Sequence, residues 1–405
     1  MPPRPRSTTN FHRYSLRAAF LLLACGLLSG CLSAPTLNRA VIAYDEAMHD
    51  SIAKQLLINI ARARYHQPIH FTGVSNIAAT FDFRLNAGAT PTLTGDLGRT
   101  LVPIFGGSVA ENPTISIAPI EGEDFTRRLL SPFHEQKVVL LLRQRTDIDL
   151  LLRLMAGELR VKHQGGDVPY RNNPAHAAEY EFFRKVVLHL SAIQDANALY
   201  AEPLVFERTW TLPESAVSAE GFKSLEQDYF IAHDAEAKLY RLRKPVSGRI
   251  LITNFDPDTL PQEERIRLDE EADQDPTDEL GFDIRPGHPG GEWPIRGEFR
   301  LRSFNTILGF LGHTIEEAPE FHVEPDPRTP AVAENPVATL DMAVGTLPSA
   351  NADWSATTHG NTYAVNVTGP NARWNRESFK LLYQLFQMTV TDVSRAGVPG
   401  ITIAK

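Results

Sequence analysis

Cysteine and long apolar runs are what this sequence of 405 residues has least of. Its two cysteines, Cys25 and Cys31, lie close together near the amino terminus, so a disulfide framework through the rest of the chain is excluded. The apolar run at 18–28 is shorter than the about 20 residues that a permanent membrane-spanning helix needs. A basic segment without acidic residues precedes this run, and the two together are typical of a cleaved secretory signal.

The end of the apolar run and the residues after it indicate which kind of signal this is. An aliphatic residue and two small residues directly precede a cysteine, in the order Leu28, Ser29, Gly30 and Cys31. This segment resembles the lipobox of bacterial lipoproteins. The resemblance implies that a signal peptidase cuts between Gly30 and Cys31 and that Cys31 carries fatty acyl chains such as palmitate. It also implies sorting to the outer membrane, because Leu32 is not the aspartate that retains such proteins in the inner membrane. The expected location is the cell envelope, with a lipid anchor and a body that faces the periplasm.

The charge balance limits the partners of the processed chain. Removal of residues 1–30 takes away four arginines and leaves 36 basic and 49 acidic side chains, a net charge of −13. Binding to nucleic acid or to an anionic lipid surface needs basic patches, so this acidic balance disfavours both. We therefore expect contact with the membrane through the lipid on Cys31, a protein partner in the envelope, and no cofactor.

The predicted fold class is α+β. Strands and helices alternate irregularly, without the regular strand, helix, strand spacing of a doubly wound sheet. The processed length exceeds what one core usually supports, which favours two or three domains. The expected organisation is a signal peptide at 1–30, a lipidated tether at 31–40, an amino-terminal α+β domain at 41–162, a middle α+β region at 176–255, an acidic loop or linker at 256–292 and a carboxy-terminal α+β domain at 293–405.

Two segments have the clearest helical periodicity. Apolar residues recur every four positions from Tyr44 to Ile60, and a second apolar stripe follows His176. The other expected helices are at 121–130, 147–159, 304–315 and 379–386. Strands are expected at 69–85, 114–118, 204–211, 229–242, 249–254, 297–302, 362–367 and 401–404, with glycine-rich turns and a loop between 86 and 113, a linker at 163–175, and an open assignment for 138–142.

The acidic segment from Asp256 to Asp283 is the most tempting metal site. It holds twelve acids against two arginines, and acidic residues alternate from Asp269 to Asp275. An EF-hand loop that began at Asp269 would need glycine at its sixth position and an acid at its twelfth, where this chain has Gln274 and Leu280. We therefore expect an exposed acidic loop that binds no metal.

Histidine, serine and glycine motifs give no catalytic or metal signature. His66 and His70 flank Pro68, which opposes a shared helical face, and no second histidine follows His134 at zinc-binding spacing. Ser108 lacks the following glycine of a nucleophile elbow. The glycines near 95–98 lack the lysine of a phosphate-binding loop. We predict neither a catalytic residue nor a metal ligand.

Three tryptophans in the carboxy-terminal part could form a sugar-binding platform. Trp293, Trp354 and Trp374 lie near glycine or proline, but buried packing is the commoner use of tryptophan and is expected here. The sequence thus predicts an outer-membrane lipoprotein that binds or scaffolds an envelope partner without catalysis. The alternatives are a tethered envelope hydrolase with scattered catalytic residues and a ligand-binding lipoprotein of a transport or secretion system.

Overall fold

The computed structural model describes residues 33–91, 101–163, 165–272, 278–346 and 353–390. The chain divides into two compact units, Met1–Leu56 and Leu57–Lys405. Helix α2, Ser33–Arg64, confirms the first predicted amphipathic helix and crosses the boundary between them. Within the described ranges, no helix combines the length and the apolar character that crossing a bilayer requires. Gly30, Cys31 and Leu32, which carry the predicted cleavage, lipid attachment and sorting, lie outside those ranges.

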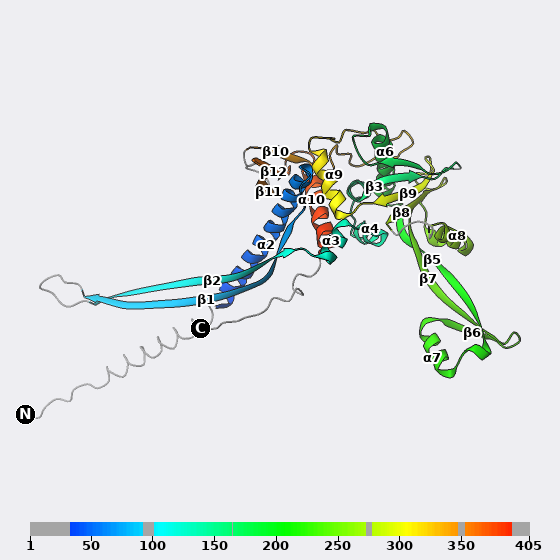
Figure 1. Cartoon of the computed structure of the whole chain (residues 1–405), viewed down its shortest axis with the longest axis horizontal. Helices are drawn as coiled ribbons and strands as arrows, with labels where there is room; N and C mark the ends of the chain where they lie inside the picture. Colours follow the sequence, from blue (N-terminus) through cyan, green and yellow to red (C-terminus); the bar gives the residue numbers. More distant parts are fainter. Residues whose placement is uncertain (1–32, 92–100, 164, 273–277, 347–352, 391–405) are drawn as a thin grey trace, which may run out of the picture. The chain divides into compact units, whose positions relative to one another are not determined.

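A seven-stranded sheet forms the centre of the second unit (Figure 1). Its order is β4, β3, β9, β8, β7, β5, and β6 pairs with β7. Only β7 and β8 run parallel, and the largely antiparallel pairing confirms the α+β class. The regions expected as separate domains at 41–162, 176–255 and 293–405 all contribute strands to this sheet. The strands are β3 Ala156–Val161, β4 Val168–Arg171, β5 Tyr200–Pro213, β6 Phe230–Asp234, β7 Leu239–Thr253, β8 Glu279–Ile284 and β9 Ile295–Leu301.

Helices pack on this sheet through apolar faces. The predicted helix after His176 is confirmed as α6, Ala177–Asp195, and the Phe183 ring meets the Phe299 ring of β9 edge-on, with centroids 6.0 Å apart. The open segment at 138–142 belongs to a helix, α4. The expected helix at 147–159 ends earlier, at Met155, because its remaining residues enter the sheet as β3. The other helices are α3 Glu123–Leu130, α4 Glu135–Leu142, α5 Ile148–Met155, α7 Ala219–Asp228, α8 Gln262–Ala272, α9 Phe304–Thr314 and α10 Ala372–Gln387, with 3-10 turns η1 Glu214–Ala216 and η2 Pro257–Thr259.

An aromatic cluster joins α9 and α10 to the start of strand β1. The Phe71 ring lies 4.4 Å from that of Phe386 and 6.3 Å from that of Phe304, measured between centroids. A small sheet follows in the order β10, β12, β11, with bounds Met342–Gly345, Asn361–Val365 and Ser355–Thr358. It confirms the strand predicted near 362–367.

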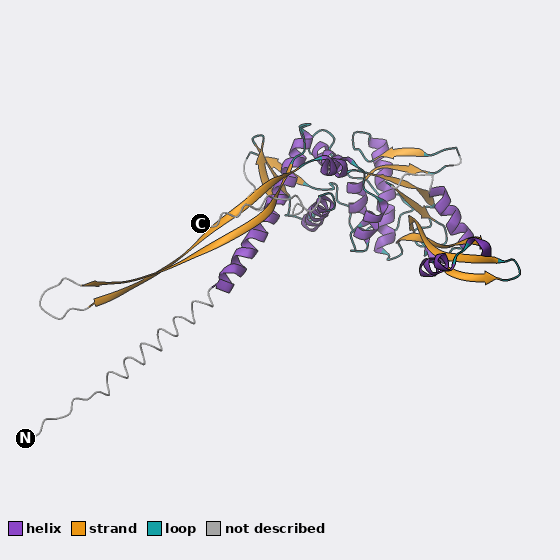
Figure 2. Ribbon diagram, turned by 60° about the horizontal axis from the view of Figure 1, so that its bottom comes forward, coloured by secondary structure: helices purple, strands orange, loops and turns teal. Residues whose placement is uncertain are grey.

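The prediction of turns and a loop between 86 and 113 is wrong for the residues of that segment that the structure describes. Strands β1, Phe71–Pro91, and β2, Leu101–Ile120, form a long antiparallel hairpin, drawn as two extended strands in Figure 2. Gly106 and Gly107 pair in register with Asn86 and Leu85, because glycine weakens a strand without preventing its backbone from pairing. The final strand predicted at 401–404 lies outside the described residues.

The acidic loop expected at 256–292 is also wrong for its described part. It contains helix α8 and strand β8, and the carboxylate of Asp269 is buried, where it accepts the Arg249 N–H at 2.8 Å. The segment forms a helix despite its high charge, because Leu268 packs in an apolar cluster with Leu204 and Phe206. Pro257 is the first residue of η2 and Pro261 directly precedes α8, positions at which proline is tolerated. Likewise, the expected linker at 163–175 contains β4.

Candidate functional site

A groove of about 990 Å³ lies beside one end of the central sheet. The end of β4 and the residues after it form one wall, and the end of β9 with helix α9 forms the other. Ser303 begins α9 as its cap, and its side chain accepts the Thr306 N–H at 3.2 Å. The lining residues that bear on chemistry are Arg171, Asn172, Arg300, Arg302, His313 and Glu317.

Arg302 forms the floor of this groove. Its buried guanidinium donates to the backbone carbonyls of Arg153 at 2.9 Å, Leu154 at 3.2 Å and Asn172 at 2.7 Å, and lies 4.1 Å from the Phe310 ring centroid. Burial lowers the pKa of Arg302 to about 9. The group therefore keeps its positive charge at neutral pH, and carbonyl dipoles stabilise it.

Asn172 offers an unused acceptor at the same place. Its side-chain amide donates to the carbonyls of Arg153 at 3.0 Å and Ala156 at 2.8 Å, and the residue is only 1% exposed. Among the described residues, its Oδ1 atom has no hydrogen-bond partner. A buried acceptor without a donor is costly, so a ligand N–H or O–H that reached it would be favoured.

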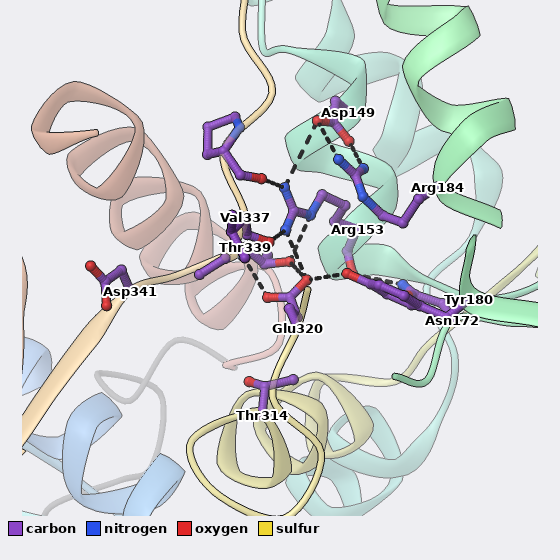
Figure 3. Close-up of polar contacts among 12 residues, drawn as sticks. Asp149, Arg153, Asn172, Tyr180, Arg184, Thr314, Glu320, Val337, Thr339 and Asp341 are labelled. Atoms are coloured by element: carbon purple, nitrogen blue, oxygen red, sulfur yellow. Dashed lines mark hydrogen bonds and ion pairs between the residues drawn. The ribbon is translucent and has the colours of Figure 1, made fainter. Parts of the chain in front are cut away.

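A buried ion network adjoins Arg302 through Arg153. It is defined as Asp149, Arg153, Tyr180, Arg184, Glu320 and Thr339 (Figure 3). Arg153 donates to Glu320 Oε1 at 2.8 Å, to Thr339 Oγ1 at 2.9 Å and to the carbonyl of Pro336 at 2.8 Å. Glu320 also accepts the Tyr180 hydroxyl at 2.8 Å. The network thereby joins helices α5 and α6 to the irregular segment between α9 and β10.

Opposite charges balance inside this network. Arg184 binds both carboxylate oxygens of Asp149, the longer contact being 3.2 Å. Burial works to raise the pKa of Glu320, but the charge of Arg153 and hydrogen bonds from Arg153 and Thr339 hold that pKa below its ordinary value. Burial and the charge of Glu320 raise the pKa of Tyr180, which therefore remains a protonated donor. Since Arg153 also supplies a backbone carbonyl to Arg302, this network is linked directly to the groove floor.

Two further arginines make the groove favourable for anions. The side chains of Arg171 and Arg300 are 56% and 47% exposed. Their ion-pair contacts are long, 3.9 Å to Glu179 and 3.5 Å to Glu279. The lining also holds two acids. Glu158 accepts a close hydrogen bond from Arg160 at 2.8 Å, so its charge is matched outside the lining, and Glu317 lies 3.5 Å from His313.

The structure brings together one group with metal-ligand chemistry in the part of the chain it describes: His66, His313 and Glu317. The sequence argument weighed His66 only against its near neighbour His70 and predicted no metal ligand. The spacing of His313 and Glu317, one helical turn apart, was a signal for two of the three residues. His66 comes from a distant segment, so no local motif could have revealed it.

The other residues singled out from the sequence lie in or next to helices and strands, or outside the described ranges. Trp293 and Trp374 are buried, the Trp374 ring N–H donates to the Thr339 carbonyl at 3.1 Å, and Trp354 stacks on Phe379 at 4.7 Å between centroids, which confirms packing roles. Ser108 belongs to strand β2 and His134 precedes α4. Residues 92–100, with their glycines, lie outside the described ranges.

Comparison with known proteins adds no relative to this picture. No family model, curated protein or solved structure matches the chain. The proposals that follow rest on the amino-terminal motif and on the geometry of the groove.

Proposed function

We propose that this chain is an outer-membrane lipoprotein, anchored through acyl chains on Cys31, whose periplasmic body binds an acidic segment of an envelope partner in the groove without catalysing a reaction. The observation that carries the binding part is that the exposed guanidinium groups of Arg171 and Arg300 line one groove, with the buried positive charge of Arg302 beside them. Guanidinium groups bind carboxylates in a fixed, bidentate geometry, so they select acidic partners well.

The anchor is supported by the lipobox at 28–31 and by the energetics of acyl chains. Each buried methylene contributes about 0.8 kcal/mol, and two or more chains hold a protein firmly in a bilayer. Leu32 supports sorting to the outer membrane through the same resemblance.

The use of the groove hydroxyls as a helix cap supports binding rather than catalysis. The hydroxyls that face it belong to Ser303 and Thr306, and both are used at the start of α9: Ser303 Oγ accepts the Thr306 N–H, and Thr306 Oγ1 donates to the Ser303 carbonyl at 2.9 Å. These contacts are those of a helix cap.

A tethered envelope hydrolase remains the second candidate, and His313 and Glu317 favour it because they line the groove. A metal held there would activate water for hydrolysis. A hydrolase of this kind would lose turnover of its substrate when either residue is replaced, whereas a binding protein would not turn over its partner at all.

The binding proposal is tested with a fluorescent hexaglutamate peptide and the purified full-length protein in detergent. We expect saturable binding that weakens at least about tenfold in an Arg171→Glu and Arg300→Glu double variant, because charge reversal replaces attraction with repulsion. Arg373→Glu is the matched control, since Arg373 is 73% exposed on α10 and does not line the groove. Equal binding by the double variant and this control would disprove the proposal.

The anchor is tested separately by metabolic labelling with an alkyne analogue of palmitate. Wild-type protein should take up the label, and Cys31→Ser should take up none, because the thiol is the acceptor. Label retained in Cys31→Ser would exclude lipidation at this position.

A further inference from the structure

His313 and Glu317 form a pair at the carboxy-terminal end of α9. Their Nε2 and Oε2 atoms are 3.5 Å apart, and the two side chains are 41% and 52% exposed. In a tetrahedral zinc site with metal–ligand bonds of about 2 Å, neighbouring ligand atoms lie roughly 3.3 Å apart. The pair already has the separation of two ligands on one ion.

His66 approaches this pair from the end of α2. Its imidazole centroid lies 5.7 Å from that of His313, and its ligand atom lies within 4.8 Å of the other two. The remaining distance to a metal-bound geometry is about 1 to 2 Å, which rotation about the side-chain bonds of an exposed histidine covers.

The backbone at His66 is shaped to present this side chain. His66 adopts a left-handed conformation with φ 54°, and the Gln67 N–H donates to the Arg62 carbonyl at 2.8 Å, which closes the helix. Glycine is the usual residue at such a position because it has no Cβ to strain. The chain holds a histidine there instead, where its ring reaches α9.

A close helix contact keeps the two segments in register. A Cβ atom at Gly312 would lie 2.7 Å from the Arg64 amide nitrogen and 2.9 Å from the Ile60 carbonyl oxygen. Only a residue without a side chain permits this approach. His313 directly follows Gly312, and His66 lies two residues after Arg64. The close approach at Gly312 therefore brings the two histidines near each other.

We propose that His66, His313 and Glu317 bind a divalent transition metal ion. Two imidazoles and one carboxylate suit zinc, cobalt, nickel or copper, whereas calcium and magnesium prefer all-oxygen sites. Three protein ligands leave at least one coordination position for water or for a ligand in the groove. The neighbouring cation Arg64 pairs with Glu316, so Glu317 is left to the metal.

The test uses the purified full-length protein in detergent, with a streptavidin-binding tag rather than a histidine tag, and no groove ligand. Cobalt(II) is titrated while its visible absorption is followed, and zinc is then added as competitor. We expect one equivalent of cobalt to bind and zinc to displace it. His66→Asn, His313→Asn and Glu317→Gln should each weaken binding at least about tenfold, a loss seen even for changes beside a metal ligand. Asparagine is chosen at position 66 because it tolerates the left-handed backbone.

His322→Asn is the matched control. His322 is also an exposed histidine paired with a carboxylate, 3.1 Å from Glu324, but it is not part of the three-residue group. Circular dichroism of the metal-free proteins separates lost ligands from lost folding. Absence of cobalt binding by wild type, or the same affinity in all four variants, would overturn the proposal. Neither result depends on peptide binding, so this site and the binding function succeed or fail independently.

Discussion

The guanidinium of Arg153 and the carboxylate of Glu320 form an ion pair of 2.8 Å whose side chains are 0% and 3% exposed. Arg153 comes from α5, and Glu320 from the irregular segment after α9. Burial of two charges is expensive, and their attraction offsets that cost only while both are present. The pair therefore holds helix α5 to the irregular segment after α9 as long as both charges are present.

Removal of one partner of this buried ion pair should destabilise the protein strongly. Arg153→Met leaves Glu320 buried without its cation, and the expected loss in free energy of unfolding is about 3 to 5 kcal/mol. Denaturation by urea measures it. The control is Arg376→Met, whose partner Asp353 is 2.9 Å away in an exposed pair and should cost less than about 1 kcal/mol. Similar losses in both variants would contradict a structural role for the buried pair.

The contact at Gly312 gives a second test within a single helix. Gly312→Ala forces a methyl group against the backbone of α2 and should cost about 1 to 3 kcal/mol. Gly309→Ala meets nothing within 4 Å and should stabilise the helix by roughly 0.5 to 1 kcal/mol. Thermal melts of the two variants should shift in opposite directions. A Gly312→Ala variant that melted no lower than wild type would show that the helices are not held in close contact at Gly312.

Asp147 should make stability depend on pH. Burial, together with the negative charge of Asp149, raises the pKa of Asp147 to about 6 from 3.8, although its carboxylate caps α5 by accepting the Asp149 N–H at 2.7 Å. Between pH 3.8 and about 6, the folded state therefore holds a proton that the unfolded state has released. This bound proton stabilises the folded state, and the stabilisation is lost as pH rises through about 6.

Asp147→Asn should remove that dependence and keep the cap, because asparagine caps helices equally well. Between pH 5 and pH 7, wild type should lose about 1 kcal/mol of unfolding free energy relative to the variant. Guanidinium denaturation at both values measures the difference. A wild type that gained stability over this range relative to the variant would reverse the sign assigned to Asp147.

If the chain carries the lipid anchor that we propose, Leu32 should determine the membrane to which it is sorted. By the resemblance to lipoproteins, Leu32→Asp should move the protein from the outer to the inner membrane. Sucrose-gradient separation of the two membranes reads the outcome, and Leu32→Ala is the control that changes the side chain without adding the retention signal. Outer-membrane recovery of the aspartate variant would show that this rule does not apply to the chain.

Local patterns in the sequence sufficed for the main helices and the fold class. The repeat from Tyr44 to Ile60 lies in α2, and the stripe after His176 lies in α6, because helix faces depend on spacing along one segment. The prediction of a loop for the acidic segment was wrong because it too depended on local composition. Its charges outnumber its apolar residues, and only the apolar cluster around Leu268 shows that α8 packs against the sheet.

By itself, the sequence determined the resemblance of residues 28–31 to a lipobox, the short apolar run, the acidic balance and the α+β class, since each depends on composition or neighbouring residues. Tertiary structure alone decided the groove, the ion network and the metal-ligand group. Arg153 meets Glu320, and His66 meets His313, across long stretches of chain. Such contacts arise from how helices and strands pack, and a close approach such as that at Gly312 leaves no periodic trace in the sequence.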